Sequence, residues 1–185
     1  MTATTATNSA VTTWNVDPAH SAAEFKVKHM MISNVKGKFS GISGVLKLDE
    51  ADPTRSSIEA TVPVATLSTG DEQRDGHLKS ADFFDADKFP TFSFKSTEVG
   101  CTAPGEHAVV GELTLHGVTR AVSFAVEGPS EPGKDPWGNT RIGLSATARI
   151  NRKDFGLSWN AALETGGVLV GEDVTISLDI QFIKA

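Results

Sequence analysis

The sequence has a single cysteine, no tyrosine and no long hydrophobic run. With Cys101 alone, the 185-residue chain can form neither an internal disulfide nor a cysteine-based zinc cluster. Without tyrosine, and with its three tryptophans dispersed, it lacks the aromatic platform on which nucleobases stack. No apolar stretch approaches the roughly 18 residues of a membrane span. These absences disfavour disulfide scaffolds, zinc fingers and membrane-spanning helices.

Basic charge is also scarce. Seventeen lysines and arginines stand against 23 aspartates and glutamates, which gives a net charge of −6. Nucleic-acid binding requires a basic face, and glycine-rich phosphate motifs are missing too, so no nucleic-acid partner is expected. The hydrophobic fraction of 39% is ordinary for a globular chain with a sizeable core.

The first thirteen residues, MTATTATNSAVTT, are small and polar. They contain neither the basic segment nor the apolar stretch of a secretory signal. We therefore expect a flexible tail over 1–13, a single domain over 14–185, and a cytoplasmic location.

From Trp14 onward the dominant pattern is an alternation of apolar and polar residues with period two, which is typical of half-buried strands. In residues 23–29, for example, Phe25, Val27 and His29 share one face. The pattern recurs about eight times, and no two strands are separated by a helix of the βαβ kind. The sequence therefore predicts an all-β fold of antiparallel strands, either a sandwich or a barrel. An eight-stranded barrel can enclose one small ligand.

One segment, 68–89, interrupts the alternation. Thr69 and Glu72 have the spacing of a capping box, which predicts a short helix. Phe83, Phe84 and Phe89 follow it closely. A long insertion with three aromatic residues favours a cap over one end of a barrel rather than a free loop.

Four blocks in order resemble the YceI-like family of polyisoprenoid-binding proteins: HSAAEFKVKHMMISNVKGKFSGISG (20–44), RDGHLKSADFFDADKFPTFSF (74–94), GELTLHGVTRAVSF (111–124) and WGNTRIGLSATARINRKDFGLSW (137–159). The resemblance implies an eight-stranded antiparallel lipocalin-like barrel with a short helical insertion, a long apolar pore and no catalysis. The expected function is the binding, storage or transport of a long apolar lipid, a polyisoprenoid or an isoprenoid quinone. No other cofactor is expected, and a homodimer remains an open prediction.

The alternation and the cap together predict the residues that contact the ligand. They are Phe25, Val27, His29, Phe83, Phe84, Phe92, Phe94, Leu113, Leu115, Phe124, Ile142 and Leu144. His20 and Arg74 are candidates for contacts with a ligand head group, since apolar pockets carry a few placed polar groups.

Competing interpretations accompany several of these residues. Asp17, His20 and Ser21 are the residue types of a hydrolase triad, but adjacent strand residues point to opposite faces, so we expect capping by Asp17 and Ser21 instead. For His29 the preferred interpretation is a buried histidine bonded to a neighbour, and the alternative is a polar contact in the ligand pore. The five histidines lack metal-ligand spacing, so no metal is expected.

Two other functions remain open. One is an enzyme that uses a histidine or aspartate inside the barrel on a small apolar substrate, which a perturbed acid or histidine beside a polar floor would indicate. The other is a stress-response interaction module without a ligand, which a barrel filled by side chains would indicate.

Overall fold

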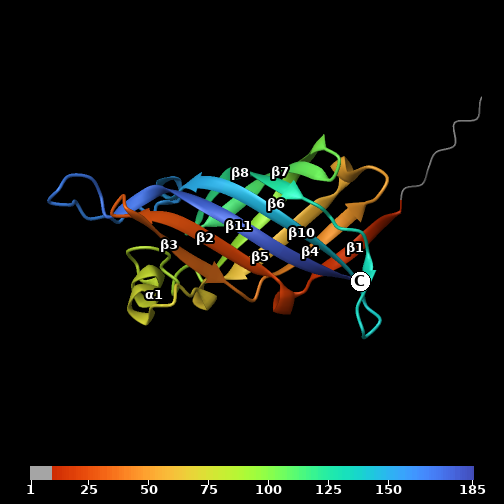
Figure 1. Ribbon diagram of the computed structural model, residues 1–185, viewed down its shortest axis with the longest axis horizontal. Coiled ribbons are helices and arrows are strands. Elements are labelled where there is room, and N and C mark those ends of the chain that lie inside the picture. Colours follow the sequence, from red (N-terminus) through yellow and green to blue (C-terminus); the bar gives the residue numbers. More distant parts are fainter. Residues whose placement is uncertain (1–9) are drawn as a thin grey trace, which may run out of the picture.

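The computed structural model describes residues 10–185, and their strands form one antiparallel sheet (Figure 1). The strands are β1 (Val11–Val16), β2 (Ala22–His29), β3 (Ser33–Phe39), β4 (Ser43–Asp49), β5 (Ser57–Pro63), β6 (Thr91–Ala103), β7 (Glu106–Leu115), β8 (Val118–Glu127), β9 (Gly133–Lys134), β10 (Thr140–Asn151) and β11 (Val170–Lys184). The described helices are α1 (Glu72–Lys79) and four 3-10 turns, η1 (Pro18–His20), η2 (Pro53–Arg55), η3 (Val64–Thr66) and η4 (Arg152–Phe155).

The sheet closes into a barrel because β11 pairs with both β10 and β1. The closed circuit runs β1-β4-β5-β6-β7-β8-β10-β11 and returns to β1. These eight antiparallel strands confirm the predicted fold class. The β2–β3 hairpin extends the wall from β11, and β9 pairs with the start of β10.

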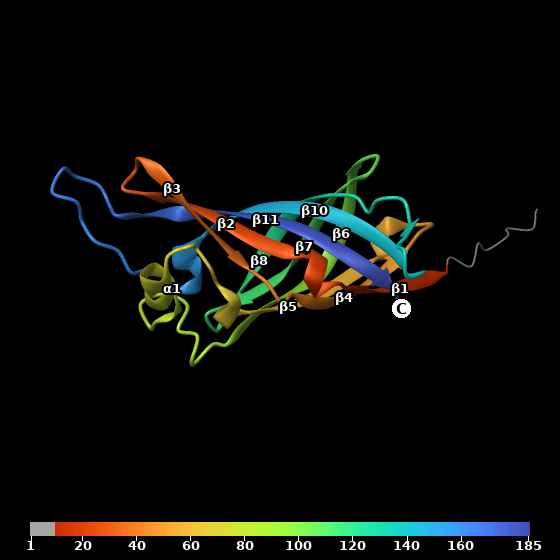
Figure 2. The same ribbon diagram turned by 60° about the horizontal axis from the view of Figure 1, so that its bottom comes forward.

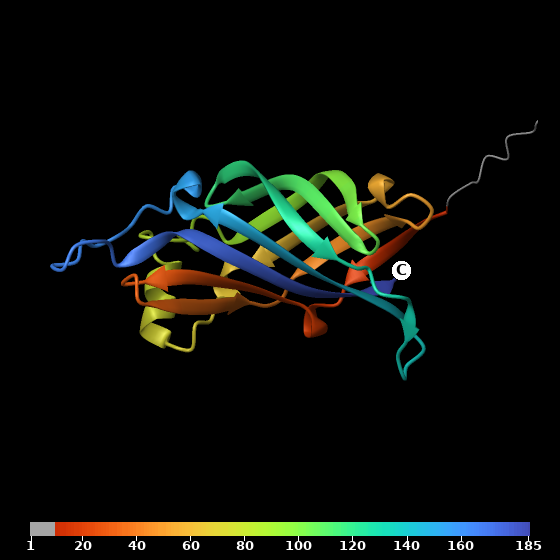
Figure 3. The same cartoon turned by 45° about the horizontal axis from the view of Figure 1, so that its top comes forward.

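β3 pairs with β2 on one side only, so its other edge has no described strand beside it in the sheet. Lys38 and Ser68 exchange two backbone hydrogen bonds of 2.9 Å, and this bridge helps to tie β3 to the segment after β5. That segment runs through η3 and α1 back to β6, and it passes beside the end of β3 (Figure 2). We call the end of the barrel that carries α1 the α1 end. The opposite end holds η2, β9 and the last residue of β11 (Figure 3).

The first strand begins earlier than expected. Val11 to Thr13 pair with Asp49 to Lys47 of β4, and the Thr12 hydroxyl donates to the carbonyl of Leu48. Since β4 offers their backbone groups a paired edge, these residues belong to the barrel, and the tail predicted over 1–13 extends too far. Its residues 1–9 lie outside the described part of the chain.

The helix in the insertion is as short as predicted, but its cap differs. Asp71 is the N-cap, and its side chain accepts a 2.8 Å hydrogen bond from the backbone N–H of Arg74. The backbone N–H and the hydroxyl of Thr69 both donate to Asp75 instead. Asp71 is the N-cap because it directly precedes the first helical residue and aspartate is an effective N-cap.

The core consists of two clusters of buried side chains. One is built around Trp14, Phe39 and Phe182, and the other around Phe124 and Phe155. Both clusters share the half-buried residues Leu78, Phe84, Phe92, Leu144 and Leu178. These shared residues are less buried than their neighbours because they border a cavity.

Candidate functional site: a cavity inside the barrel

A cavity of about 270 Å³ runs through the interior of the barrel. Val27, Leu157 and Val170 line it at the α1 end, and Pro53 and Pro129 line it at the opposite end. This volume is close to the lower limit of about 300 Å³ for small-molecule pockets and far above the space that one water requires. The barrel is therefore not filled by its own side chains.

The wall of the cavity is nearly all apolar. Every lining residue is apolar or glycine except Glu24, Ser56, Ser57, Ser93, His107 and Arg152. A group of phenylalanines supplies much of the surface. The Phe39 ring meets the Phe84 and Phe92 rings edge-on at 5.6 and 4.9 Å, and Phe94 meets Phe124 at 5.1 Å. Because edge-to-face pairs are favourable, the rings hold one another in place around the empty volume.

Two glycines let aromatic rings lie across neighbouring strands. A Cβ atom on Gly37 would come within 2.4 Å of the Phe25 ring, and one on Gly111 would come equally close to the Phe94 ring. A glycine covered by a cross-strand aromatic ring is a known device in β-sheets. Here it gives the cavity broad aromatic patches on β2 and β6.

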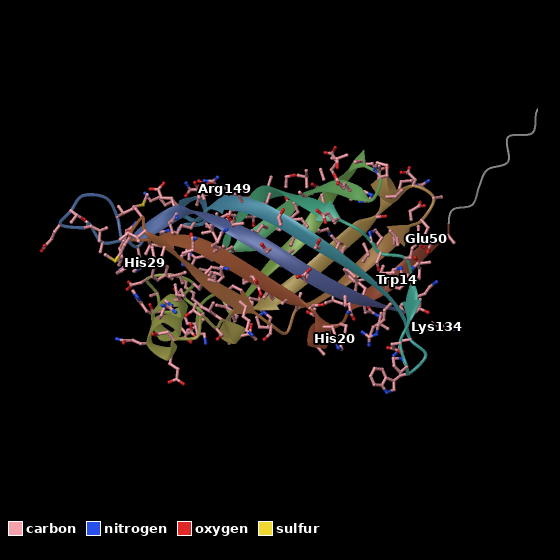
Figure 4. All side chains as sticks on the ribbon, in the orientation of Figure 1. Trp14, His20, His29, Glu50, Lys134 and Arg149 are labelled. Atoms are coloured by element: carbon pink, nitrogen blue, oxygen red, sulfur yellow. The ribbon has the colours of Figure 1, made fainter. Side chains whose placement is uncertain are left out.

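Most of the predicted ligand-contact residues lie on this wall. They are Phe25, Val27, Phe83, Phe84, Phe92, Phe94, Leu113, Leu115, Phe124 and Leu144. His29 and Ile142 do not. His29 lies half-buried at the last position of β2 (Figure 4), where it pairs with Ser33, and it is not among the residues that line the cavity. Ile142 is inward-facing but is only 3% exposed, packed among Trp14 and its neighbours where side chains fill the interior.

Neither candidate for a head-group contact lines the cavity. His20 lies on η1 with 56% of its side chain exposed, and its Nδ1 is 2.8 Å from Oδ2 of Asp17 (Figure 4). Arg74 is exposed on α1, where its guanidinium donates to the hydroxyl and carbonyl oxygens of Thr69. Both side chains have local partners on the outer surface, and their contact with a ligand head group stays a prediction.

The triad-like residues serve the local fold instead. Asp17 caps η1 by accepting a hydrogen bond from the backbone N–H of Ala19, as predicted. The Ser21 hydroxyl donates to the carbonyl of Gln181 rather than to His20. Arg141 donates to Asp17 at 2.5 Å and to Asp135 at 2.7 Å, which joins η1 to the loop before β10. The hydrogen bonds from Arg141 and then His20 lower the pKa of Asp17 to about 2.

Arg152 is a wall residue that the sequence did not reveal. It is 5% exposed, and its guanidinium donates to the backbone carbonyls of Gly171, Leu157 and Val170. Burial lowers its pKa. Among residues 10–185 it is the only lysine or arginine on the wall, and it stands at the α1 end. Its stretch, NRKDFGL, resembles an exposed turn, so nothing in the pattern indicated a buried charge.

The predicted contact residues also omit β11. Four of its apolar residues line the cavity: Val174, Ile176, Leu178 and Ile180. They alternate with polar residues, so the period-two pattern that identified the inward faces of β2 and β6 was enough to predict them.

The insertion forms the predicted cap at the α1 end. Leu78, Phe83 and Phe84 line the cavity from the cap. The Phe83 ring packs against Trp159 at 5.3 Å, whereas the Phe84 ring packs on the opposite side against Phe39 of β3. Phe89 lies off the wall and packs near His116 and Gly117 at the β7–β8 turn. The cap therefore reaches both sides of the barrel mouth.

A closed antiparallel barrel with an apolar interior cavity defines the class of lipocalin-like ligand-binding barrels. The family model described as a YceI-like domain matches residues 14–182. The protein from *Staphylococcus aureus* strain N315 named UPF0312 protein SA2479 is 38% identical over 173 residues, which cover 93% of this chain and 98% of that relative. The chain belongs to the YceI-like family. No helix in the described part of the chain is long and apolar enough to span a membrane.

Solved structures share the fold. BcnA from *Burkholderia cenocepacia* superposes with a TM-score of 0.78 at 24% identity, over 90% of this chain and 98% of that one. The YCEI protein from *Campylobacter jejuni* gives a TM-score of 0.71 at 28% identity, over 86% and 91%. A polyisoprenoid binding domain from *Saccharophagus degradans* gives 0.66 at 16% identity, over 95% and 100%.

Proposed function

We propose that the barrel binds and carries a long apolar lipid, either a polyisoprenoid or the tail of an isoprenoid quinone, without catalysing a reaction. The observation that carries the proposal is the continuous apolar cavity along the barrel. Family membership supports it, and so does the polyisoprenoid-binding domain of *S. degradans* among the structures with the same fold.

Burial supplies enough free energy for such a ligand. At about 0.8 kcal/mol per buried CH₂, one five-carbon isoprene unit contributes roughly 4 kcal/mol. Two units would contribute about 8 kcal/mol, which corresponds to a micromolar Kd before the costs of ordering the chain. An apolar wall of this kind selects the shape and length of the chain more than its chemistry.

The polar end of the ligand belongs, on this proposal, near Arg152 at the α1 end. A guanidinium, as the only lysine or arginine group on the described wall, favours a ligand atom that accepts hydrogen bonds. The apolar chain then extends toward Pro53 and Pro129.

The decisive experiment is mass spectrometry of an organic extract of the purified protein. The expected result is an isoprenoid lipid in a near-stoichiometric amount. A variant that fills the cavity locates the bound lipid. Ala60 pairs with Phe94 across β5 and β6 and lines the cavity, so the phenylalanine of Ala60→Phe occupies part of the cavity volume. Loss of the lipid from this variant, with a wild-type melting curve, would place the lipid in the cavity. An extract without lipid, together with no uptake of a fluorescent isoprenoid analogue, would refute the proposal.

The two other functions make different demands on the wall. A module without a ligand would need a filled interior, which the cavity disfavours. An acid–base enzyme would need a perturbed histidine or carboxyl at the cavity. The described carboxyls with shifted pKa values, Asp17, Asp75, Asp135 and Glu172, all lie off the wall. A cytoplasmic location and a homodimer remain predictions.

A further inference from the structure

The turn between β2 and β3 exposes three consecutive large apolar residues. Met30 is 41% exposed, Met31 61% and Ile32 78%. Val168, which is 36% exposed, lies in the neighbouring loop before β11, and a Cβ on Gly167 would come within 3.8 Å of the Met31 side chain. Single exposed apolar residues are ordinary, but a contiguous group of them indicates a contact surface.

The backbone of this turn does not explain why methionine occupies it. Met30 and Met31 have φ values of +52° and +59°, and the N–H of Ile32 donates to the carbonyl of His29 at 3.1 Å. Two successive residues with positive φ normally favour asparagine and glycine, because a Cβ makes the left-handed region unfavourable. The two methionines are therefore held against the preference of the turn, which indicates that their side chains serve another purpose.

A cluster of lysines lies directly behind this apolar tip. Lys26, Lys28, Lys36 and Lys38 are all exposed on the outer face of the β2–β3 hairpin, in a protein of net charge −6. Lys26 lies directly opposite Lys36, an arrangement that destabilises a sheet. Within residues 10–185 none of the four takes part in an ion pair, and Glu24 is the acidic residue on this face.

The tip and the lysines stand at the α1 end, beside the cap and the cavity. Met30 donates its N–H to the carbonyl of Leu169 at 2.7 Å, and the adjacent Val170 lines the cavity. Figures 1 and 2 both show the β2–β3 turn beside the loop before β11, at the end that carries α1. A strand rises about 3.3 Å per residue, so Lys28 lies about 7 Å behind Met30 and Lys26 about 13 Å behind it.

We propose that the β2–β3 hairpin docks the α1 end of the barrel on a lipid bilayer that contains anionic lipids. Met30, Met31 and Ile32 enter the boundary of the hydrocarbon region. The head-group layer is about 5–8 Å thick on each side, so Lys28 meets the phosphates and the lysines behind it face the negative surface. The charge complementarity between these lysines and an anionic surface selects a membrane rather than a protein as the partner. The inference rests on the proposed function, because docking brings the capped end of the lipid cavity to the lipid.

The test is cosedimentation of the full chain with vesicles of phosphatidylcholine alone or with about 30% phosphatidylglycerol, at low and high salt. Binding is expected to the anionic vesicles and to fall as salt rises. The tip variant is Met30→Asn with Met31→Gly and Ile32→Ser. Since Asn-Gly is the dipeptide this turn favours, the variant keeps or raises the melting temperature while losing at least about tenfold in vesicle binding.

The lysine variant, Lys26→Gln with Lys36→Gln, should lose about fivefold per lysine on anionic vesicles and nothing on neutral ones. Two matched controls change similar groups elsewhere. Trp137→Ser removes an 80% exposed apolar residue from the loop between β9 and β10, at the opposite end, and Lys47→Gln with Lys134→Gln removes two lysines outside the hairpin. Both controls should bind vesicles like the wild type.

Three outcomes would overturn the inference: no binding to the anionic vesicles, unchanged binding by the tip variant, or equal losses in the controls. Uptake of a fluorescent isoprenoid analogue by the same preparation, measured without vesicles, separates this failure from failure of the proposed function. If uptake persists without vesicle binding, only the docking inference is wrong, and the exposed tip serves a protein partner.

Discussion

The side chains of Phe94 and Lys26 lie on opposite sides of the barrel wall. Phe94 borders the cavity and packs against Phe124, whereas Lys26 is exposed. Phe94→Asp should lower the free energy of unfolding by about 4 kcal/mol, because it removes an aromatic ring and places a charge on an apolar wall. Lys26→Asp should cost nothing measurable, and it relieves the repulsion with Lys36. Urea denaturation of both variants tests this, and similar losses would mean that the faces are assigned wrongly.

The ion pairs around Asp17 predict a dependence of stability on pH. The pKa of Asp17 is lowered from 3.8 to about 2, first by the hydrogen bond from Arg141 and then by that from His20. A carboxyl with a lowered pKa stabilises the fold above its unfolded pKa, and this contribution disappears as the pH falls through the folded value.

Asp17→Asn should therefore be less stable than the wild type above about pH 4, and the difference should shrink as the pH approaches 2. Urea titrations at a series of pH values measure this difference. A gap between the two proteins that does not change with pH would contradict the role assigned to Arg141.

Single residues also show where sequence analysis reaches its limit. Phe25, Phe94 and Leu113 were assigned to the interior correctly, since alternation along a strand decides which face a side chain occupies. Alternation says nothing about depth along the barrel, so it could not separate Ile142, in the packed region, from Leu144, on the cavity wall. Arg152 was missed because two of the three carbonyls that it binds, those of Gly171 and Val170, belong to the next strand, β11, and only that of Leu157 is local.

Among the secondary-structure elements, the cap makes the clearest prediction about ligand exchange. Phe84 is half-buried and borders the cavity, whereas Phe83 is 6% exposed and packed against Trp159. Phe84→Ala should therefore speed the release of a fluorescent isoprenoid analogue several-fold, with a fall of only a few degrees in melting temperature. Phe83→Ala should cost about 3 kcal/mol of stability. If release by Phe84→Ala matches the wild type, the ligand enters elsewhere.

The boundary of β1 makes a second prediction at this scale. Removing residues 2–9 should leave the melting temperature within about two degrees, whereas removing 2–13 should lower it by more than about five degrees. The longer deletion takes away the pairing of Val11 to Thr13 with β4. Differential scanning calorimetry of the two truncations tests the boundary, and equal melting temperatures would favour a tail that reaches Thr13.

The insertion shows which features of an element its sequence can predict. Its position, its short helix and its role as a cap followed from the interrupted alternation and the clustered phenylalanines. The N-cap did not, because Thr69 and Asp71 are both good caps and the choice depends on the backbone path through Gly70, whose φ is +81°.

For the whole molecule, the strand count and the short connections predicted an antiparallel β-fold, and the four sequence blocks selected a barrel over a sandwich. Closure itself could not be seen in the pattern, since it depends on the pairing of Trp14 with Lys184, residues at opposite ends of the described chain. The pattern also could not show that β11 pairs with β2 along its first part and with β1 near its end. Nor could it show that the cap lies beside the free edge of β3.

That closing strand has a consequence for biosynthesis. β11 pairs with β1, β2 and β10, and it follows all of them in the chain. Synthesis proceeds from the N-terminus, so the barrel cannot close before β11 has been made. Until then the strands that precede β11 lack the partner that covers their phenylalanine-rich inner side. A newly made chain should therefore depend on chaperones until the fifteen residues of β11 emerge and close the barrel.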